Sequence, residues 1–243
     1  MKKTVFVTGA SGGIGSEICR IFAENGFDII AQYNKGEKEI ECLKKELEER
    51  FSVSVFPLYA DLSKSEDVFS LCERALSVSK NIDVLVNNAG VTLRSLFQLV
   101  EEEDAKRLLS INLESAMTIT RKILPSMIRE KKGKIVNVSS MWGVTGGSCE
   151  VDYSASKAAL IGFSKALSKE VGPSGINVNC VAPGFIETKM NACFDEETKH
   201  EIAESCSLCK NGTPRDVAEL VLFLSSEKAD FITGQIISVD GGR

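Results

Sequence analysis

The sequence contains few of the residues and segments that mark unusual proteins. Proline occurs only 5 times in 243 residues, and the 43% of hydrophobic and 26% of charged residues are close to the globular average. Collagenous, low-complexity and disordered chains are therefore excluded. Apolar runs are short: the stretch 220–224 cannot span a membrane, and the run after Lys3 is soon broken by glycine and serine. We expect a cytoplasmic protein with no membrane partner.

The chain also lacks a surplus of basic residues. It carries 29 Lys and Arg against 34 Asp and Glu, a formal net charge of −5, and the basic residues are scattered along the sequence. A basic stripe of the kind that binds nucleic acid is absent, so we expect no nucleic-acid partner. At this length the chain can bury a large core without disulfides or metals.

Eight cysteines are present, but their spacing is not that of a disulfide framework. We interpret most of them as reduced thiols that pack as small hydrophobic residues. One spacing is suggestive: Cys206 and Cys209 form a Cys-x-x-Cys pair, with Cys193 and the only histidine, His200, nearby. A second such pair is missing, so we predict no metal site. A redox or metal role for Cys206 and Cys209 stays open.

Short β-branched segments alternate with longer segments of helical period. Strands are predicted over residues 4–8, 27–33, 53–59, 82–87, 134–139, 175–181 and 235–239. Helices are predicted over 14–24, 37–50, 65–79, 101–131 (two helices around Asn112), 153–171 and 214–225. This alternation predicts an α/β fold with a Rossmann-type, doubly wound, parallel seven-stranded sheet.

The whole chain, residues 1–243, is predicted to form a single domain, because no linker, charge block or repeat interrupts the alternation. One stretch departs from it, residues 184–213, which lie between the sixth predicted strand and the next helix. A long insertion after the carboxyl end of a strand lies over the ligand crevice of such a sheet. We therefore expect 184–213 to form a substrate lid.

A glycine-rich turn follows the first predicted strand directly, and it reads Thr8-Gly9-Ala10-Ser11-Gly12-Gly13-Ile14-Gly15. Glycines at this place allow a tight turn and let backbone N–H groups approach a pyrophosphate at the helix N-terminus. The turn predicts dinucleotide binding. The expected contacts are Gly9, Ser11, Gly13, Ile14 and Gly15.

Further motifs stand after later strands. They are Asn87-Asn88-Ala89-Gly90, Ser140 thirteen residues before Tyr153, Tyr153-Ser154-Ala155-Ser156-Lys157, and Pro183-Gly184. With the Gly-x-x-x-Gly-x-Gly spacing, these motifs resemble the short-chain dehydrogenase/reductase family over essentially the whole chain. The resemblance implies an oxidoreductase and a homotetramer. It also implies that the cofactor contacts Asn88, Ala89, Gly90, Pro183, Gly184, Ile186 and Thr188.

Tyr153 and Lys157 lie four residues apart at the start of a predicted helix and so share a face. An ammonium beside a phenol favours the phenolate, so we expect Lys157 to lower the pKa of Tyr153 and make it a general acid. Ser140 can donate a hydrogen bond to the same carbonyl oxygen. The resemblance implies that Lys157 also holds the ribose and that Asn112 positions a water for proton supply. Considered one at a time, Tyr153 and Lys157 are also consistent with an ordinary surface pair, and Ser140 with an ordinary residue at the end of a strand.

The end of the second predicted strand reads Gln32-Tyr33-Asn34-Lys35 and lacks the acid that would bond the 2′-hydroxyl of NAD. We therefore predict NADP(H), with Asn34 and Lys35 around the 2′-phosphate. Many NADP-using relatives carry an arginine where this chain has Gly12. Asp61 and Leu62 stand where the family contacts adenine, although Asp61 is equally suited to capping the next helix.

The substrate is less closely defined. Residues 181–188 and 234–242 resemble bacterial reductases of 3-oxoacyl groups on acyl carrier protein, and Arg129, Lys131 and Lys132 could serve an acidic carrier near the site. Ser174, however, stands where those enzymes carry arginine.

Trp142 and Glu150 depart from those reductases and resemble reductases of the 5-aminopentanone group on elongation factor P. A carboxylate there suits a cationic substrate. Alternatively, Trp142 is a packing aromatic and Glu150 a solvated loop acid. The favoured function is NADPH-dependent ketone reduction, first of 3-oxoacyl carriers, then of the aminopentanone. A non-catalytic dinucleotide-binding redox sensor is the third possibility.

Overall fold

The structure is a computed structural model that describes residues 2–243. Over these residues seven strands form one parallel sheet in the order β3-β2-β1-β4-β5-β6-β7. The strands are β1 (Thr4–Val7), β2 (Asp28–Tyr33), β3 (Val55–Tyr59), β4 (Val84–Asn87), β5 (Gly133–Val138), β6 (Ile176–Pro183) and β7 (Ile236–Val239). The predicted doubly wound sheet is confirmed.

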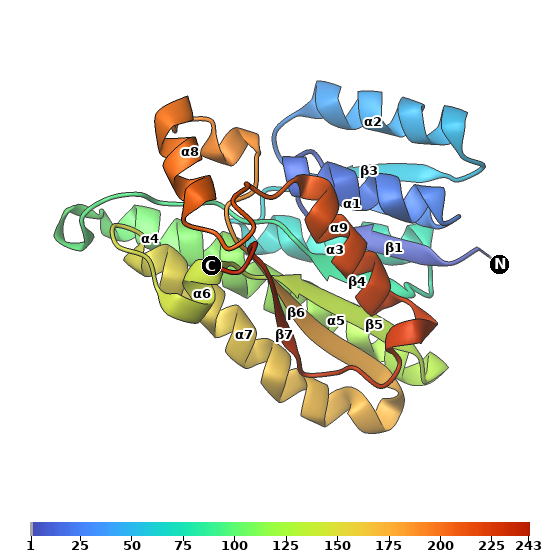
Figure 1. The fold of residues 1–243 in the computed structure, drawn as a ribbon. Helices are drawn as coiled ribbons and strands as arrows, with labels where there is room; N and C mark the ends of the chain where they lie inside the picture. The colour runs from blue at the N-terminus through green and yellow to red at the C-terminus, as the bar shows by residue number, and fades with distance from the viewer. Residues whose placement is uncertain (1) are drawn as a thin grey trace.

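Helices cover both faces of the sheet (Figure 1). One face carries α1 (Gly13–Glu24), α2 (Glu37–Arg50) and α9 (Pro214–Ser225), and the other carries α3 (Ser65–Val78), α5 (Ser115–Glu130) and α7 (Val151–Val171). Two apolar clusters fill the two interfaces, which is why strands such as β4 are buried along their whole length. β1 pairs with β2 on one side and with β4 on the other, so the direction of winding reverses between β1 and β4. A crevice opens at this point at the carboxyl edge of the sheet.

Some elements differ from the sequence prediction. The predicted segment 101–131 is α4 (Glu102–Leu109), one π-helical turn (Ser110–Glu114) that contains Asn112, and α5. Two short helices, α6 (Met141–Thr145) and α8 (Glu196–Glu204), were not predicted. Short 3₁₀ turns occur at η1 (Phe97–Leu99), η3 (Gly172–Ser174), η4 (Lys189–Asn191) and η5 (Glu227–Ala229). All these pieces are too short or too polar to give a periodic signal.

A buried chain of hydrogen bonds ties the sheet to the helices beneath it. Asn87 of β4 donates to Asn137 of β5 at 2.8 Å and to Thr120 of α5 at 3.0 Å. Asn137 in turn donates to Ser164 of α7 at 2.7 Å. Since buried amides must find partners, this chain fixes the position of α5 and α7 against the carboxyl half of the sheet.

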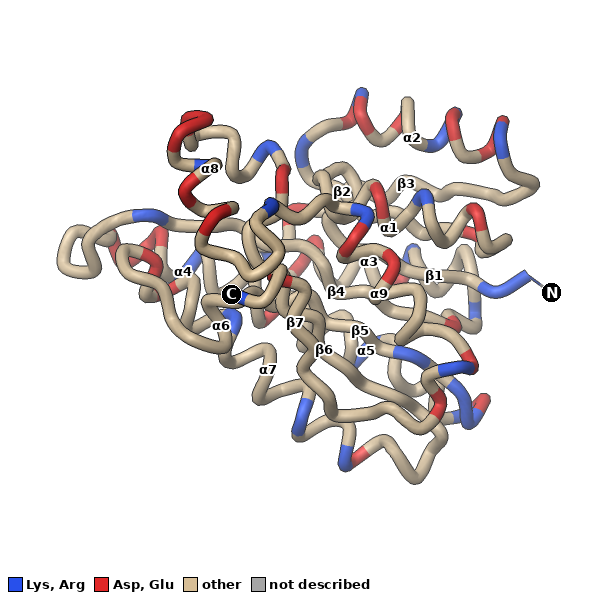
Figure 2. The backbone as a smooth tube through the Cα atoms, viewed as in Figure 1, with Lys and Arg blue, Asp and Glu red and all other residues tan. Residues whose placement is uncertain are grey.

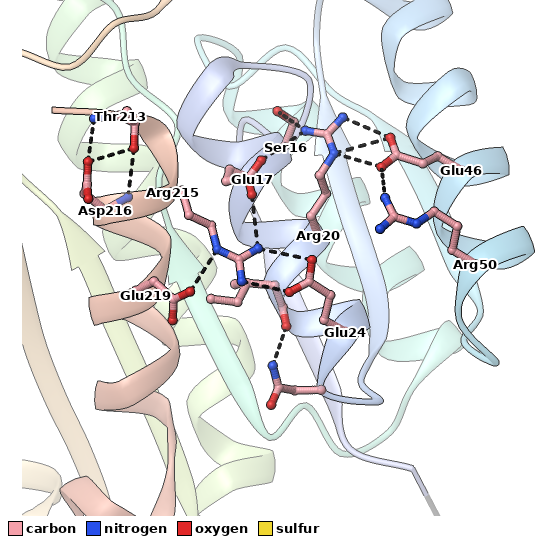
Figure 3. Close-up of polar contacts among 12 residues, drawn as sticks. Ser16, Glu17, Arg20, Glu24, Glu46, Arg50, Thr213, Arg215, Asp216 and Glu219 are labelled. Atoms are coloured by element: carbon pink, nitrogen blue, oxygen red, sulfur yellow. Dashed lines mark hydrogen bonds and ion pairs between the residues drawn. The ribbon is translucent and has the colours of Figure 1, made fainter.

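Ion pairs hold α1 between its two neighbours (Figure 3). Arg20 of α1 contacts Glu46 of α2 at 3.0 Å. Arg215 of α9 contacts two acids of α1, Glu17 at 3.3 Å and Glu24 at 2.8 Å. The glycine turn leads straight into α1, so this network helps to fix the turn in place.

Acidic and basic residues are intermixed along α2, while α8 is largely acidic (Figure 2). Among residues 2–243, no helix is both long enough and apolar enough to cross a membrane.

Candidate active site

A cavity of about 930 Å³ lies at the carboxyl edge of the sheet, where the winding reverses. Its volume suits a dinucleotide with part of a substrate. The residues predicted to bind cofactor or substrate come together here. Those lining it are Gly9, Ser11, Gly13, Ile14, Gly15, Asn34, Lys35, Leu62, Asn88, Ala89, Gly90, Ser140, Trp142, Glu150, Tyr153, Lys157, Pro183, Gly184, Ile186 and Thr188.

Three glycines of the turn, Gly9, Gly13 and Gly15, have no room for a side chain. Gly9 has φ +67°, and a β-carbon on it would lie 2.9 Å from the Cα of Ala89. A β-carbon on Gly15 would collide with the carbonyl oxygen of Gly9, and one on Gly13 would lie 2.9 Å from Cγ2 of Thr188. The backbone at the start of α1 is thus exposed to the cavity, as a pyrophosphate site requires. These residues fit a dinucleotide.

Two loops on either side of the winding reversal are joined by hydrogen bonds. Thr8 accepts at its hydroxyl from the backbone N–H groups of Asn88 and Ala89, both at 3.0 Å. The side chain of Asn88 donates to the Thr8 carbonyl at 2.9 Å. The Asn-Asn-Ala-Gly motif therefore holds the glycine turn at a fixed distance from β4.

The end of β2 carries no acidic residue, and hydrogen bonds connect it to the glycine turn and to the end of β3. Buried Gln32 accepts from the Gly9 N–H at 2.8 Å and donates to the Ala60 carbonyl at 2.9 Å. Ser11 donates to the Lys35 carbonyl at 2.7 Å. Asn34 and Lys35 are left facing the cavity, where they could hold a phosphate.

The helix-capping alternative for Asp61 is wrong. Residue Lys64 occupies the N-cap of α3, while Asp61 accepts hydrogen bonds from the backbone and hydroxyl of Ser63, at 3.0 and 2.7 Å. Leu62 lines the cavity, and Asp61 does not.

Ser140, Tyr153 and Lys157 meet at one end of the cavity. Ser140 is the N-cap of α6 and accepts from the Trp142 N–H at 3.2 Å. Lys157 is buried and donates to the carbonyl oxygen of Val138, at the end of β5, at 2.8 Å. The short helix α6 packs closely on α7: a β-carbon on Gly143 would lie 2.8 Å from the Lys157 backbone.

The expected effect of Lys157 on Tyr153 is wrong for this structure. Burial raises the pKa of Tyr153 above its usual range, and the nearby Ser140 hydroxyl only partly opposes this. The Lys157 ammonium lies 5.9 Å from the centre of the Tyr153 ring and donates a hydrogen bond to the Val138 carbonyl oxygen instead. Burial also lowers the pKa of Lys157 to about 8. Burial therefore outweighs the expected attraction between the two groups.

Asn112 reaches the same region from the π-helical turn. Its side chain accepts from the Val91 N–H at 2.8 Å, donates to the Val91 carbonyl at 2.9 Å and donates to Ser156 of α7 at 3.1 Å. A β-carbon on Gly90 would lie 3.1 Å from the Lys157 ammonium and 3.4 Å from Asn112 Oδ1. Asn112 thus fixes the loop after β4 close to Lys157.

The alternative that Glu150 is a solvated loop acid is wrong. Glu150 is only 9% exposed, and its carboxylate accepts from Arg94 at 2.8 Å and from Thr92 at 3.1 Å. A cationic substrate would have to compete with Arg94 for it. Sequence reasoning missed Arg94, because nothing near it in the chain signals a partner 56 residues away. Trp142 lines the cavity, with the Arg243 guanidinium 5.8 Å from its ring.

The three basic residues that the sequence predicted as contacts for an acidic carrier protein do not lie near the cavity. Arg129, Lys131 and Lys132 end α5 or precede β5, which places them at the amino edge of the sheet. A β-carbon on Gly175, just before β6, would meet the Lys131 carbonyl. Within one chain they therefore lie at the edge opposite the cavity.

The segment 184–213 contains η4 and α8 and contributes Phe185, Ile186, Thr188, Lys189, Met190, Asn191, Phe194 and Ile202 to the cavity. Cys193 and Cys209 are exposed and Cys206 is buried. Between residues 2 and 243, no group of three or more His, Cys, Asp and Glu side chains is placed to hold a metal ion.

The fold and the cavity define a Rossmann-type oxidoreductase that takes a nicotinamide dinucleotide. The family model described as short chain dehydrogenase matches residues 3–199, and the chain belongs to this family.

Relatives match over the full length. The chain is 41% identical over 242 residues to the "Uncharacterized oxidoreductase YmfI" of Bacillus subtilis, covering 100% of this chain and 99% of the relative. It is 40% identical to 3-oxoacyl-acyl-carrier-protein reductase FabG of Aquifex aeolicus, covering 99% and 96%.

Among solved structures, the NADPH-dependent reductase YwfH, involved in bacilysin biosynthesis, superposes with a TM-score of 0.92 at 29% identity, covering 100% and 98%. A blue fluorescent protein from a metagenomic library in complex with NADPH also gives 0.92, at 33% identity, covering 99% and 97%.

Proposed function

We propose that this protein reduces a ketone to a secondary alcohol with NADPH. The observation that carries the proposal is the convergence of Ser140, Tyr153 and Lys157 on the cavity that the glycine turn also lines. A redox sensor without catalysis needs the glycine turn but has no use for a proton donor beside it. We therefore rank the sensor below the enzyme.

When bound, the nicotinamide supplies a hydride to the carbonyl carbon. Tyr153 then gives its phenolic proton to the carbonyl oxygen, while Ser140 donates a hydrogen bond to that oxygen. The raised pKa of Tyr153 keeps the phenol protonated near neutral pH, which suits an acid. Lys157, with a pKa of about 8, can return a proton to the phenolate. Asn112 supports Lys157 by holding the loop at Gly90, and a water it positions stays a prediction.

NADPH is the proposed form of the cofactor for two reasons. Asn34 and Lys35 face the cavity at the end of β2, where no acid opposes a 2′-phosphate. One solved structural neighbour is an NADPH-dependent reductase, and another was solved in complex with NADPH. The glycine turn would receive the pyrophosphate, and Leu62 and Ala89 flank the same cavity. Pro183, Gly184, Ile186 and Thr188, which line the cavity, are proposed contacts, and Asp61, which does not line it, stays a prediction from the family resemblance.

The proposed substrate is a 3-oxoacyl thioester on an acyl carrier protein. Six basic residues line the cavity: Lys35, Arg94, Arg107, Lys157, Lys189 and Arg243. Glu150 is the one acid among the lining residues, and Arg94 already neutralises it. This excess of positive charge favours a substrate whose ketone is neutral and is carried on an anionic, phosphate-bearing arm over a substrate that is itself a cation. Relatives named as 3-oxoacyl reductases point the same way.

The second candidate substrate is an amino-ketone such as the aminopentanone group on elongation factor P. It is favoured by the presence of Glu150 and Trp142 in the same cavity wall. A carboxylate and an aromatic face together recognise an ammonium. Here the substrate would have to displace Arg94 from Glu150, which is the reason for its second rank.

NADPH oxidation, followed by absorbance, separates these candidates. The substrates are acetoacetyl-acyl carrier protein, acetoacetyl-CoA and 5-amino-2-pentanone, each with and without 0.3 M salt. We expect kcat/KM to be at least about tenfold higher for the thioesters. A preference for the amino-ketone would reverse the ranking, and NADPH binding without turnover of any substrate would favour the sensor.

A further inference from the structure

Arg94 lies in the loop between β4 and η1 and connects two parts of the cavity wall. It contacts Glu150 at the start of α7, and it contacts Asn191, Cys193 and Phe194 in the segment 184–213. We propose that Arg94 is a positioning residue that fastens the segment 184–213 over the cavity and balances the charge of Glu150 beside Tyr153. This inference rests on the proposed function.

The contacts to the segment 184–213 use the outer part of the guanidinium. One amino group donates to Asn191 Oδ1 at 2.9 Å, and the other donates to the Cys193 sulfur at 2.9 Å. The guanidinium carbon lies 4.6 Å from the centre of the Phe194 ring, which itself packs against Phe185 at 5.6 Å. A planar group with several fixed donors can hold three such partners at once, whereas a lysine cannot.

The contact to α7 uses the inner nitrogen. Glu150 occupies the N-cap position of α7, and its backbone carbonyl accepts from the Ser154 N–H at 2.8 Å. Its carboxylate is nearly buried between Arg94 and Thr92. A nearly buried carboxylate without a cationic partner is strongly unfavourable, so the contact with Arg94 holds the Glu150 side chain in place. Tyr153 follows three residues later on the same helix.

The groups near Tyr153 are Ser140, Lys157, whose ammonium lies 5.9 Å from the ring centre, and the pair of Glu150 and Arg94, which meet at 2.8 Å at the N-cap of the same helix. The carboxylate disfavours the phenolate and the guanidinium favours it. Removing either partner leaves the charge of the other uncompensated. The two single variants should therefore move the titration of Tyr153 in opposite directions.

The two roles separate in a double-mutant cycle of Arg94→Gln and Glu150→Gln. The charge effect depends on both residues, so the double variant should regain the wild-type titration. The contacts to Asn191, Cys193 and Phe194 depend on Arg94 alone, so Glu150→Gln should not restore them. A residue that only stabilises the fold would give no opposite shifts in a pH profile.

The titration is measured as the pH dependence of kcat/KM for oxidation of 3-hydroxybutyryl-CoA by NADP⁺, which needs the phenolate. We expect the rising limb to move to higher pH in Arg94→Gln and to lower pH in Glu150→Gln, each on the order of half a pH unit. The double variant should return to the wild-type position. A rising limb at the same pH in all four proteins would overturn the proposed effect of Arg94 on the charge beside Tyr153.

The fastening role is measured by trypsin cleavage at Lys189 and Lys199 in the full chain, followed by mass spectrometry. We expect cleavage about three- to tenfold faster in Arg94→Gln and in the double variant, with the KM for acetoacetyl-CoA raised by a similar factor. Arg50→Gln, an exposed arginine of α2 far from the cavity, is the matched control and should behave as wild type. Unchanged cleavage in Arg94→Gln would overturn the fastening role.

Arg94→Lys keeps the inference testable if Arg94→Gln folds poorly. It retains the charge but not the set of directed donors, so the pH limb should stay and the cleavage should rise. If wild type reduces no ketone, the proposed function fails while the cleavage experiment still decides the fastening role.

Discussion

The ammonium group of Lys157 donates a hydrogen bond to the carbonyl oxygen of Val138 at 2.8 Å and thereby ties the start of α7 to the end of β5. Lys157 is 3% exposed, and it lies in a region where Asn112 and Gly90 come close. A charged group that is buried in this way loses its solvation by water, which costs free energy, while the surrounding contacts hold it in place. This relationship has consequences for both activity and stability.

Replacing Lys157 by methionine should abolish ketone reduction and stabilise the fold. Burial lowers the Lys157 pKa from 10.5 to about 8. At pH 7 the ammonium is charged in both states, but it is poorly solvated only in the folded protein. Lys157→Met should raise the free energy of unfolding at pH 7 by roughly 1–3 kcal/mol, measured by urea titration.

The pH dependence gives the control for this prediction. Between about pH 8 and 10.5 the unfolded chain binds more protons at Lys157 than the folded protein, so this residue makes wild-type stability rise with pH through that window. The difference between wild type and Lys157→Met should shrink over the same window. A constant difference would contradict the lowered pKa.

Replacing Tyr153 by phenylalanine removes the proposed proton donor and keeps the ring. We expect kcat to fall by at least about 10², with the NADPH dissociation constant nearly unchanged in a fluorescence titration. Tyr59→Phe, on the exposed edge strand β3, is the control and should keep full turnover. Near-normal turnover of Tyr153→Phe would refute the mechanism.

The choice of cofactor should depend on the end of β2. Wild type should bind NADPH more tightly than NADH, and Asn34→Asp should invert this preference because the carboxylate repels the 2′-phosphate. Asn81→Asp adds the same charge before β4, at the other edge of the sheet, and should leave the preference unchanged. Equal binding of NADH and NADPH by wild type would show that Asn34 and Lys35 do not hold the phosphate.

The ion-pair network around α1 should contribute modestly to stability. Arg215→Met removes contacts to Glu17, Glu24 and Glu219 at once, so we expect a loss of about 1 kcal/mol, smaller at 1 M salt (Figure 3). Lys45→Met breaks one exposed pair within α2 and should change stability by less than about 0.5 kcal/mol. Thermal or urea unfolding of the three proteins measures both effects, and identical losses would argue against a network.

The homotetramer remains a prediction from the family. Strand β7 pairs only with β6 among the strands of residues 2–243, and Phe231, just before it, is fully exposed. An edge strand beside an exposed aromatic suits an interface. Light scattering at micromolar concentration should give the mass of four chains, and Phe231→Ser should weaken the assembly. A monomeric mass for wild type would exclude it.

Local sequence determined most of the secondary structure. The helices α2 and α9 have the predicted bounds because each has a clear amphipathic period, and α9 begins with a Thr213 capping box and Pro214. The glycine turn could also be predicted in place, since only glycine fits where the backbones of Gly9 and Ala89 approach. The parallel sheet follows from the alternation of short apolar strands with helices.

Only the tertiary structure decided the electrostatics of the site. The hydrogen-bonded partners of Arg94 lie 56 to 99 residues away, and no period or spacing signals such contacts. The pKa values of Tyr153 and Lys157 follow from burial, which depends on how α6, α7 and β5 pack together. Sequence therefore determined which chemical groups this protein brings to the cavity. The folded structure determined their charge, because solvation and long-range pairing exist only once distant segments meet.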